Sequence, residues 1–133
     1  MDGKTLMALA EKARKLAYAP YSNFKVGCAL LCKNGKVYTG INIENVAFSP
    51  TNCAERTAIF KAVSEGEREF VAIAVCGGKN EKADEFCAPC GVCRQVMSEF
   101  CKADVKVYLG NIDEVKEFTF GEILPLAFSF DKE

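Results

Sequence analysis

The stretch Phe70-Val71-Ala72-Ile73-Ala74-Val75-Cys76 is apolar at every position. A strand with one wet face alternates apolar and polar side chains, whereas a strand covered on both faces is apolar throughout. This run therefore predicts a central strand with helices on both faces of its sheet. A helix expected to start near Pro89 or Cys90 and a strand expected over residues 105–109 follow it along the chain, which makes a β-α-β unit with a right-handed crossover.

The rest of the chain supplies further elements for the same sheet. In chain order, we expect an amphipathic helix over 6–17, strands over 26–32 and 36–42 around an Asn34-Gly35 hairpin turn, a helix from Cys53 to about Gly66, a short strand over 115–119 and a helical turn over 121–124. Residues 77–88 are polar and contain glycine, and they predict a mobile loop that covers the functional site. The expected fold is an α/β three-layer α-β-α sandwich with a mixed five-stranded sheet, in a single domain spanning residues 1–133.

The composition limits the classes of partner. The 133 residues are 50% hydrophobic, which is enough for a core without covalent staples. Lys and Arg number 17 against 18 Asp and Glu, giving a net charge of −1 with no basic block. Phosphate backbones and acidic membrane surfaces bind clustered Lys and Arg, so we expect neither nucleic acid nor a membrane as a partner. The N-terminal residues lead directly into an amphipathic pattern without a long apolar run, which predicts a cytoplasmic protein.

The chain contains eight cysteines and no histidine. Cytosolic thiols stay reduced, so a metal or redox site explains the cysteines better than disulfides do. The absence of histidine excludes Ser-His-Asp and Cys-His catalysis, HExxH metalloproteases and any His-ligated metal. Proton transfer near neutral pH must then fall to another side chain or to a metal-bound water. Four cysteines on expected strands or helix ends are interpreted as small core residues: Cys28, Cys32, Cys76 and Cys101.

Three other cysteines and one glutamate lie where two helices are expected to begin. Cys90 and Cys93 are three residues apart, so their thiols share one helix face and can hold one ion. A helix N-terminus also lowers the pKa of a thiol and favours the thiolate. A Cys-x-x-Cys pair alone indicates a redox dithiol or zinc about equally, but Cys53, with Glu55 two residues after it, favours zinc. Three protein ligands leave the fourth position of Zn²⁺ open for water, as in catalytic zinc sites.

Two residues beside Cys53 each have a structural and a functional interpretation. With Asn52 as N-cap, Glu55 stands at the third helical position, where a carboxylate can close a capping box. Because no histidine is available as a base, we favour a general acid/base role for Glu55, which capping can accompany. Arg56 is either a hydrogen-bond donor to the cysteine sulfurs or a solvated charge on the helix, and the sequence leaves both open.

The segments Cys53-Ala54-Glu55 and Pro89-Cys90-Gly91-Val92-Cys93 resemble the signature of the zinc deaminases, in which Zn²⁺ activates water and a glutamate that is not a ligand moves protons. Many members have His where this chain has Cys53, and three cysteines are typical of the small branch that acts on free nucleosides. Further similarity to cytidine deaminases of the homotetrameric kind lies in Ala19-Pro20-Tyr21-Ser22-Asn23-Phe24-Lys25-Val26-Gly27, Asn42-Ile43-Glu44-Asn45, Cys53-Ala54-Glu55-Arg56-Thr57-Ala58, Cys93-Arg94-Gln95-Val96 and Leu124-Pro125-Leu126-Ala127-Phe128.

The resemblance implies a role for each matching residue. The implied ligands of one Zn²⁺ per subunit are Cys53, Cys90 and Cys93, with Glu55 as the catalytic proton shuttle. The implied substrate contacts are Asn42 and Glu44 on the ribose 3′-hydroxyl, Phe24 against the nucleoside, the backbone of Ala54 on the base, and Phe128 on the base bound by a neighbouring subunit. The implied enzyme is a homotetramer whose active sites are completed between subunits. From the residues alone, core packing is the simpler interpretation of Phe24 and Phe128.

The implied activity is hydrolytic deamination of cytidine and 2′-deoxycytidine to uridine and 2′-deoxyuridine, with release of ammonia, in pyrimidine salvage. The acidic Glu44 and the lack of basic clusters favour a nucleoside over a nucleotide, because a phosphate needs a positive or N–H-rich cradle. One alternative keeps the fold and the zinc but acts on a cytosine-like antibiotic such as blasticidin S. Another is a thiol-redox or structural zinc module, in which Cys87 would be the fourth ligand.

Overall fold

The computed structural model describes residues 1–130 and contains a five-stranded sheet with the strand order β2-β1-β3-β4-β5. The strands are β1 (Lys25–Cys32), β2 (Val37–Ile41), β3 (Phe70–Gly78), β4 (Lys106–Gly110) and β5 (Val115–Thr119). The helices are α1 (Gly3–Arg14), α2 (Ala54–Ser64), α3 (Gly91–Phe100) and α4 (Phe120–Ile123). The pair β3–β4 is parallel, and β1–β2, β1–β3 and β4–β5 are antiparallel. The predicted mixed sheet is confirmed.

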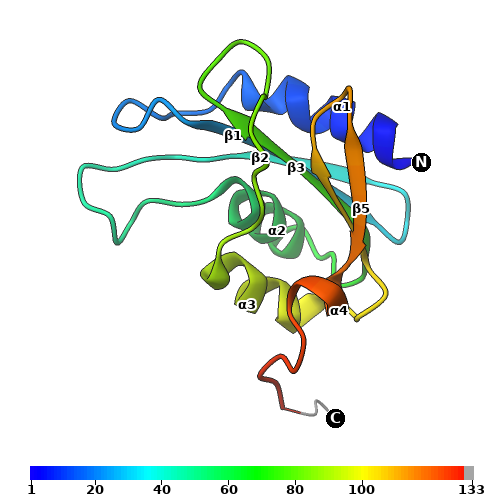
Figure 1. Ribbon diagram of the computed structural model, residues 1–133. Helices are drawn as coiled ribbons and strands as arrows, with labels where there is room; N and C mark the ends of the chain where they lie inside the picture. The colour runs from blue at the N-terminus through cyan, green and yellow to red at the C-terminus, as the bar shows by residue number, and fades with distance from the viewer. Residues whose placement is uncertain (131–133) are drawn as a thin grey trace.

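Helices cover both faces of the sheet. Figure 1 shows α1 on one face and α2 and α3 on the other. The strand β3 lies in the middle of the sheet, and all of its residues except Val71 are buried. The apolar run from Phe70 to Cys76 is therefore the centre of a three-layer α-β-α sandwich, as its composition predicted.

The alternation of side chains along β1 separates two cores. Val26, Cys28 and Leu30 point into the core on the α2–α3 side, whereas Ala29 and Leu31 point into the core beneath α1. The four cysteines interpreted as core residues are all buried: Cys28, Cys32, Cys76 and Cys101. Burial raises the pKa of each of these thiols, so they stay protonated near neutral pH.

Two glycines allow the helices to lie directly on the sheet. A Cβ on Gly27 would lie 2.1 Å from the carbonyl oxygen of Ala10 in α1, and a Cβ on Gly40 would lie 2.3 Å from the carbonyl oxygen of Ala54 in α2. Both distances are far below van der Waals contact, so a larger residue fits only if a helix moves. Gly40 thus sets the height of the first turn of α2 above β2.

The helix α1 is shorter than its periodicity predicted. It ends at Arg14 rather than near residue 17, and Leu16 is exposed. The chain leaves the helix because the backbone N–H of Tyr18 donates to the carbonyl oxygen of Asn42 and Tyr18 bridges Ile43 beyond β2. A pairing with a distant segment therefore overrides the local helical pattern.

The segment 77–88 is more ordered than its composition predicted. Gly77 and Gly78 belong to β3, Ala83 is fully buried, and the buried guanidinium of Arg14 donates to the carbonyl oxygens of Gly78 at 3.0 Å and Asn80 at 2.8 Å. The prediction of a mobile loop from residue 77 is therefore wrong for Gly77 and Gly78, which extend β3, and the chain that follows them is tied to Arg14. The reason is that a buried arginine supplies the hydrogen bonds that such a segment cannot make within itself.

Candidate metal centre and active site

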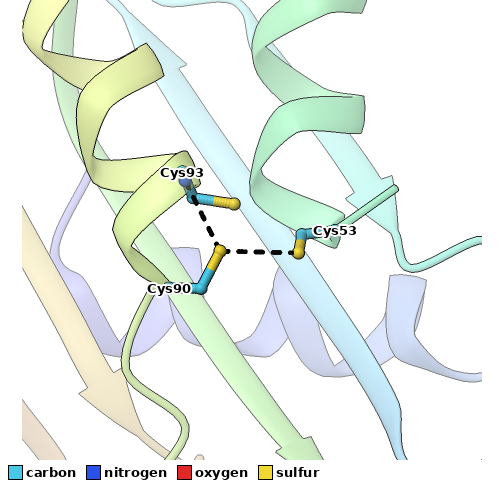
Figure 2. Close-up of side chains that lie close together, drawn as sticks. All are labelled: Cys53, Cys90 and Cys93. Carbon is cyan, nitrogen blue, oxygen red and sulfur yellow. Dashed lines mark hydrogen bonds between the residues drawn. The ribbon is translucent and has the colours of Figure 1, made fainter. Parts of the chain in front are cut away.

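Each of the two segments that carry the predicted zinc ligands places a cysteine at the start of a helix. Cys53 is the N-cap of α2, and Cys90 is the N-cap of α3. The Sγ of Cys90 accepts a hydrogen bond from the backbone N–H of Cys93 at 3.5 Å. The two helix starts lie side by side on one face of the sheet, and Figure 2 shows the three thiols turned toward one another. The cysteines that the sequence singled out are thus brought together.

Asn52 does not cap α2, and the capping-box interpretation of Glu55 is wrong. The backbone of Asn52 pairs with Ile43 in an antiparallel bridge, and its side chain donates to Oγ1 of Thr57 at 3.0 Å. This pairing keeps Asn52 extended, so the helix begins one residue later and Glu55 is its second residue. A capping box requires the carboxylate at the third position.

The three sulfur atoms have the spacing that a tetrahedral zinc site requires. The Sγ atoms of Cys53, Cys90 and Cys93 all lie within 4.8 Å of one another, and those of Cys53 and Cys90 are 3.8 Å apart. Two thiolates at the usual Zn–S distance of about 2.3 Å, at a tetrahedral angle, lie about 3.8 Å apart. Neither Glu55 nor Cys87 belongs to this cluster. The donor set therefore fits one Zn²⁺ with three thiolate ligands and an open fourth position.

The guanidinium of Arg56 lies against the thiol cluster. Its Nη2 donates to Sγ of Cys53 at 3.3 Å, so the contact that the sequence left open is present. Hydrogen bonds from Cys93 and Arg56 lower the pKa of Cys53 to about 5, and sharing of the proton with Cys53 raises the pKa of Cys93. Partial burial alone would lower the pKa of Arg56, but its hydrogen bonds to the sulfurs raise it. The site thus favours a thiolate beside a permanent cation, which offsets part of the negative charge of three thiolates.

Glu55 is a buried carboxyl group next to this cluster. Only 3% of its surface is exposed, and burial raises its pKa to about 7. A group with such a pKa exists in both protonation states near neutral pH, so it can take up and release a proton. Its position in the first turn of α2, two residues after Cys53, holds it close to the thiols without making it part of the ligand set.

Asn42 and Glu44 lie against the loop that joins α1 to β1. The side-chain oxygen of Asn42 accepts from the N–H of Val26 at 2.9 Å, and its amide nitrogen donates to the carbonyl oxygen of Phe24 at 2.8 Å. The carboxylate of Glu44 accepts from the N–H groups of Tyr21 at 2.9 Å and of Ser22 at 3.1 Å. The structure therefore brings Phe24, Asn42 and Glu44 together, and both polar side chains retain hydrogen-bonding capacity for a ligand.

Ser22 was not among the predicted site residues, although its hydroxyl lies beside Phe24 and Glu44. It donates to Glu44 and accepts from the N–H of Phe24 at 2.9 Å. The signal that could have revealed it is local: a serine two residues before the N–H that it binds is typical of a serine turn.

The ring of Phe24 and the thiol of Cys87 both lie over Gly77. A Cβ on Gly77 would lie 2.8 Å from Cε1 of Phe24 and 3.1 Å from Sγ of Cys87. Both side chains are partly buried and pack against the core on the α2–α3 side, so core packing describes Phe24 in part. Burial raises the pKa of Cys87 to about 12, and its thiol therefore stays protonated beside the cluster.

Phe128 lies away from these residues within its own chain. Its side chain is 67% exposed, packs edge-on against Phe130 with ring centroids 5.2 Å apart, and its carbonyl oxygen accepts from Nε2 of Gln95 at 3.3 Å. The core-packing interpretation of Phe128 is therefore wrong for the single chain. Ala54, in contrast, is fully buried at the start of α2.

The fold and the thiol cluster define a zinc-dependent α/β enzyme, and comparison with known proteins gives its family. Residues 2–109 match the family described as the cytidine and deoxycytidylate deaminase zinc-binding region. The chain is 54% identical to a cytidine deaminase from Halalkalibacterium halodurans, over 97% of this chain and 96% of that protein. The crystal structure of a cytidine deaminase from Burkholderia pseudomallei superimposes with a TM-score of 0.87 at 47% identity, over 96% of this chain and all of that one. The protein belongs to the cytidine and deoxycytidylate deaminase family.

The same comparisons bear on the antibiotic alternative. A blasticidin-S deaminase from Bacillus cereus is 31% identical over 78% of this chain and 76% of that protein. This similarity is lower and shorter than that to the Halalkalibacterium protein. None of the helices within residues 1–130 has the length and apolar character needed to cross a bilayer.

Proposed function

We propose that this protein catalyses the hydrolytic deamination of cytidine and 2′-deoxycytidine to uridine and 2′-deoxyuridine, releasing ammonia, in pyrimidine salvage. The observation that carries the proposal is the cluster of three thiols within 4.8 Å of one another beside a carboxyl group that is 3% exposed. Family membership supports the same reaction. A redox dithiol would leave the third thiol of the cluster without a role, and a closed structural site would leave the buried carboxyl group with a pKa of about 7 without one.

In this proposal, Cys53, Cys90 and Cys93 hold one Zn²⁺ per subunit. When bound, the ion acts as a Lewis acid that activates a water molecule for attack on C4 of the pyrimidine. Glu55 would accept one proton from the attacking water and deliver it to N3 of the base, and would then take a second proton from the hydroxyl formed on C4 and deliver it to the leaving amine as the C4–N bond breaks. Its burial supports this role, because a raised pKa lets Glu55 both accept and release a proton near neutral pH. Arg56 stabilises the Cys53 thiolate through the contact of 3.3 Å.

The remaining proposed contacts bind the nucleoside rather than the reacting atoms. Asn42 and Glu44 hold the ribose 3′-hydroxyl, Phe24 packs against the nucleoside, and the backbone of Ala54 contacts the base. The proximity of Phe24, Asn42 and Glu44 supports a shared binding role.

We also propose that the active enzyme is a homotetramer in which Phe128 of each chain reaches the base bound by a neighbour. Exposed apolar side chains support an interface: Phe48 is 95% exposed and Leu126 is fully exposed. Leu126 also has a φ of 54°, which is rare for a bulky residue and is consistent with a tail held by another chain. The single domain of this proposal spans residues 1–133, of which the last three lie outside the described residues.

A cytoplasmic location completes the proposal. All eight cysteines are free, as expected in a reducing compartment.

The decisive test of the reaction is Glu55→Gln with cytidine as substrate. This change keeps the size of the side chain but removes the proton shuttle, so kcat should fall by about 100- to 10,000-fold while metal analysis still finds one zinc per chain. The matched control is Glu65→Gln at the exposed C-terminal end of α2, which should leave kcat unchanged. A near-normal rate in Glu55→Gln would remove Glu55 from the mechanism. The loss of the cytosine absorbance measures the conversion of cytidine. A wild-type protein that causes no such loss would refute the proposed activity.

A further inference from the structure

The hydroxyl of Ser22 joins two residues that are expected to contact the nucleoside, Glu44 and Phe24. It donates a hydrogen bond to Oε2 of Glu44 and accepts one from the N–H of Phe24 at 2.9 Å. The N–H of Ser22 donates to the other oxygen of the same carboxylate, Oε1, at 3.1 Å. Ser22 therefore contacts both oxygens of Glu44 and the backbone of Phe24 at once.

The turn that presents this hydroxyl depends on a special backbone conformation. Asn23 has a φ of 60°, in the left-handed region that asparagine tolerates better than most residues. The turn from Ser22 to Phe24 is closed by the side chain of Ser22 and reverses the chain before β1. As a result, Phe24 is directed toward the core on the α2–α3 side, while Ser22 stays beside Glu44.

These contacts give the carboxylate of Glu44 a defined direction. Its Oε1 is held by the N–H groups of Tyr21 and Ser22, and its Oε2 is held by the Ser22 hydroxyl. The hydrogen bond from Ser22 is also the main reason that the pKa of Glu44 is lowered. A carboxylate that is ionised and fixed in direction still has lone pairs free to accept from a sugar hydroxyl. Without the Ser22 hydroxyl, Oε2 and the N–H of Phe24 would both lose a partner.

We propose that Ser22 is a positioning residue of the nucleoside site, whose hydroxyl orients Glu44 toward the ribose 3′-hydroxyl and fixes the turn that carries Phe24. The inference rests on the proposed function, which assigns Glu44 to the sugar and Phe24 to the nucleoside. Ser22 acts through these residues and does not touch the reacting atoms. Its removal therefore weakens substrate binding and leaves the chemical step unchanged.

The test measures steady-state deamination of cytidine and of 3′-deoxycytidine by Ser22→Ala and Ser22→Thr. Ser22→Ala should raise KM for cytidine about tenfold, which corresponds to ~1.4 kcal/mol, and should leave kcat within about twofold. With 3′-deoxycytidine, which lacks the hydroxyl that Glu44 binds, KM should rise by a smaller factor, about threefold, because only the placement of Phe24 is then lost. Ser22→Thr keeps the hydroxyl and should restore KM for cytidine.

The matched control is Ser64→Ala, at the C-terminal end of α2, the helix that carries Glu55 in its first turn. Ser64 is an exposed serine at the end of α2 whose hydroxyl donates to the carbonyl oxygen of Lys61 at 2.8 Å. Its loss should leave both kinetic constants unchanged. If Ser22→Ala melts more than about 5 °C below the wild type, Ser22→Cys, which keeps the size but donates weakly, replaces it with the same expected results.

The outcomes separate this inference from the proposed function. An unchanged KM for cytidine, an equal rise in KM for both substrates, or a fall in kcat at constant KM would overturn the role of Ser22. A wild-type enzyme without cytidine turnover would instead overturn the proposed function.

Discussion

Replacement of Gly40 by alanine tests whether the contact between β2 and α2 positions the active site. Gly40 lies in β2 directly beneath the first turn of α2, the helix that carries Cys53 as its N-cap and Glu55. A Cβ at this position would lie 2.3 Å from the carbonyl oxygen of Ala54 and 2.5 Å from the nitrogen of Ala58. Both atoms belong to the backbone, so no side-chain rotation can relieve the overlap.

The size of the effect follows from these distances. Favourable contacts between heavy atoms begin at about 3.5 Å, so the first turn of α2 must rise by about 1 Å. Overpacking of this kind costs about 1–3 kcal/mol, and we expect the upper end because the overlap is with rigid backbone. At about 4 °C per kcal/mol for a chain of this size, the melting temperature should fall by about 12 °C. Misplacement of Glu55 by about 1 Å should also lower kcat on the order of 100-fold.

Thermal unfolding followed by circular dichroism, at equal protein concentration, measures the loss of stability, and the cytidine assay measures kcat. The matched control is Gly91→Ala, where an added Cβ meets nothing within 4 Å and should shift the melting temperature by less than about 3 °C. A Gly40→Ala protein that melts within about 3 °C of the wild type would show that α2 is not held at this height by Gly40.

Three further predictions concern the metal site and the tail. Arg56→Gln should weaken zinc binding about 10- to 100-fold, measured in competition with a chromophoric chelator, because the hydrogen-bond donor 3.3 Å from Sγ of Cys53 is lost. A zinc affinity equal to that of the wild type would show that Arg56 does not stabilise the thiolate. Cys87→Ser should retain one zinc per chain by metal analysis, because Cys87 lies outside the thiol cluster; loss of zinc would favour the four-ligand structural module. Phe128→Ala should raise KM for cytidine at least about fivefold, and an unchanged KM would remove Phe128 from the neighbouring site.

Much of the fold was predictable because its signals are local. The apolar run at residues 70–76 required cover on both faces of the sheet wherever the rest of the chain went, and the alternation in β1 distributes side chains between two cores. The spacing of Cys90 and Cys93 likewise places two thiols on one helix face without any tertiary information. The absence of histidine restricted the candidate ligands and bases through composition alone.

Contacts between distant segments decided the rest. Cys53 and Cys90 are separated by 37 positions, and their sulfurs meet at 3.8 Å because the two helices begin side by side on one face of the sheet. The pairing of Asn52 with Ile43 delays the start of α2 and removes the expected capping box. Arg14 orders the segment after β3 from α1.

Contacts between distant segments also explain why the sequence identified Glu55 as a candidate site residue and did not identify Ser22. Charge and spacing marked Glu55 in the sequence, but only its burial raises its pKa to about 7, because desolvation depends on the whole surrounding structure. The local signal of Ser22 is a serine turn to Phe24, and that turn gives no indication of Glu44. The connection of Ser22 to Glu44, 22 positions away, exists because the end of β2 returns beside the turn that precedes β1. The sequence by itself thus determined which side chains could do the chemistry, and the tertiary structure decided which of them meet and in which protonation state.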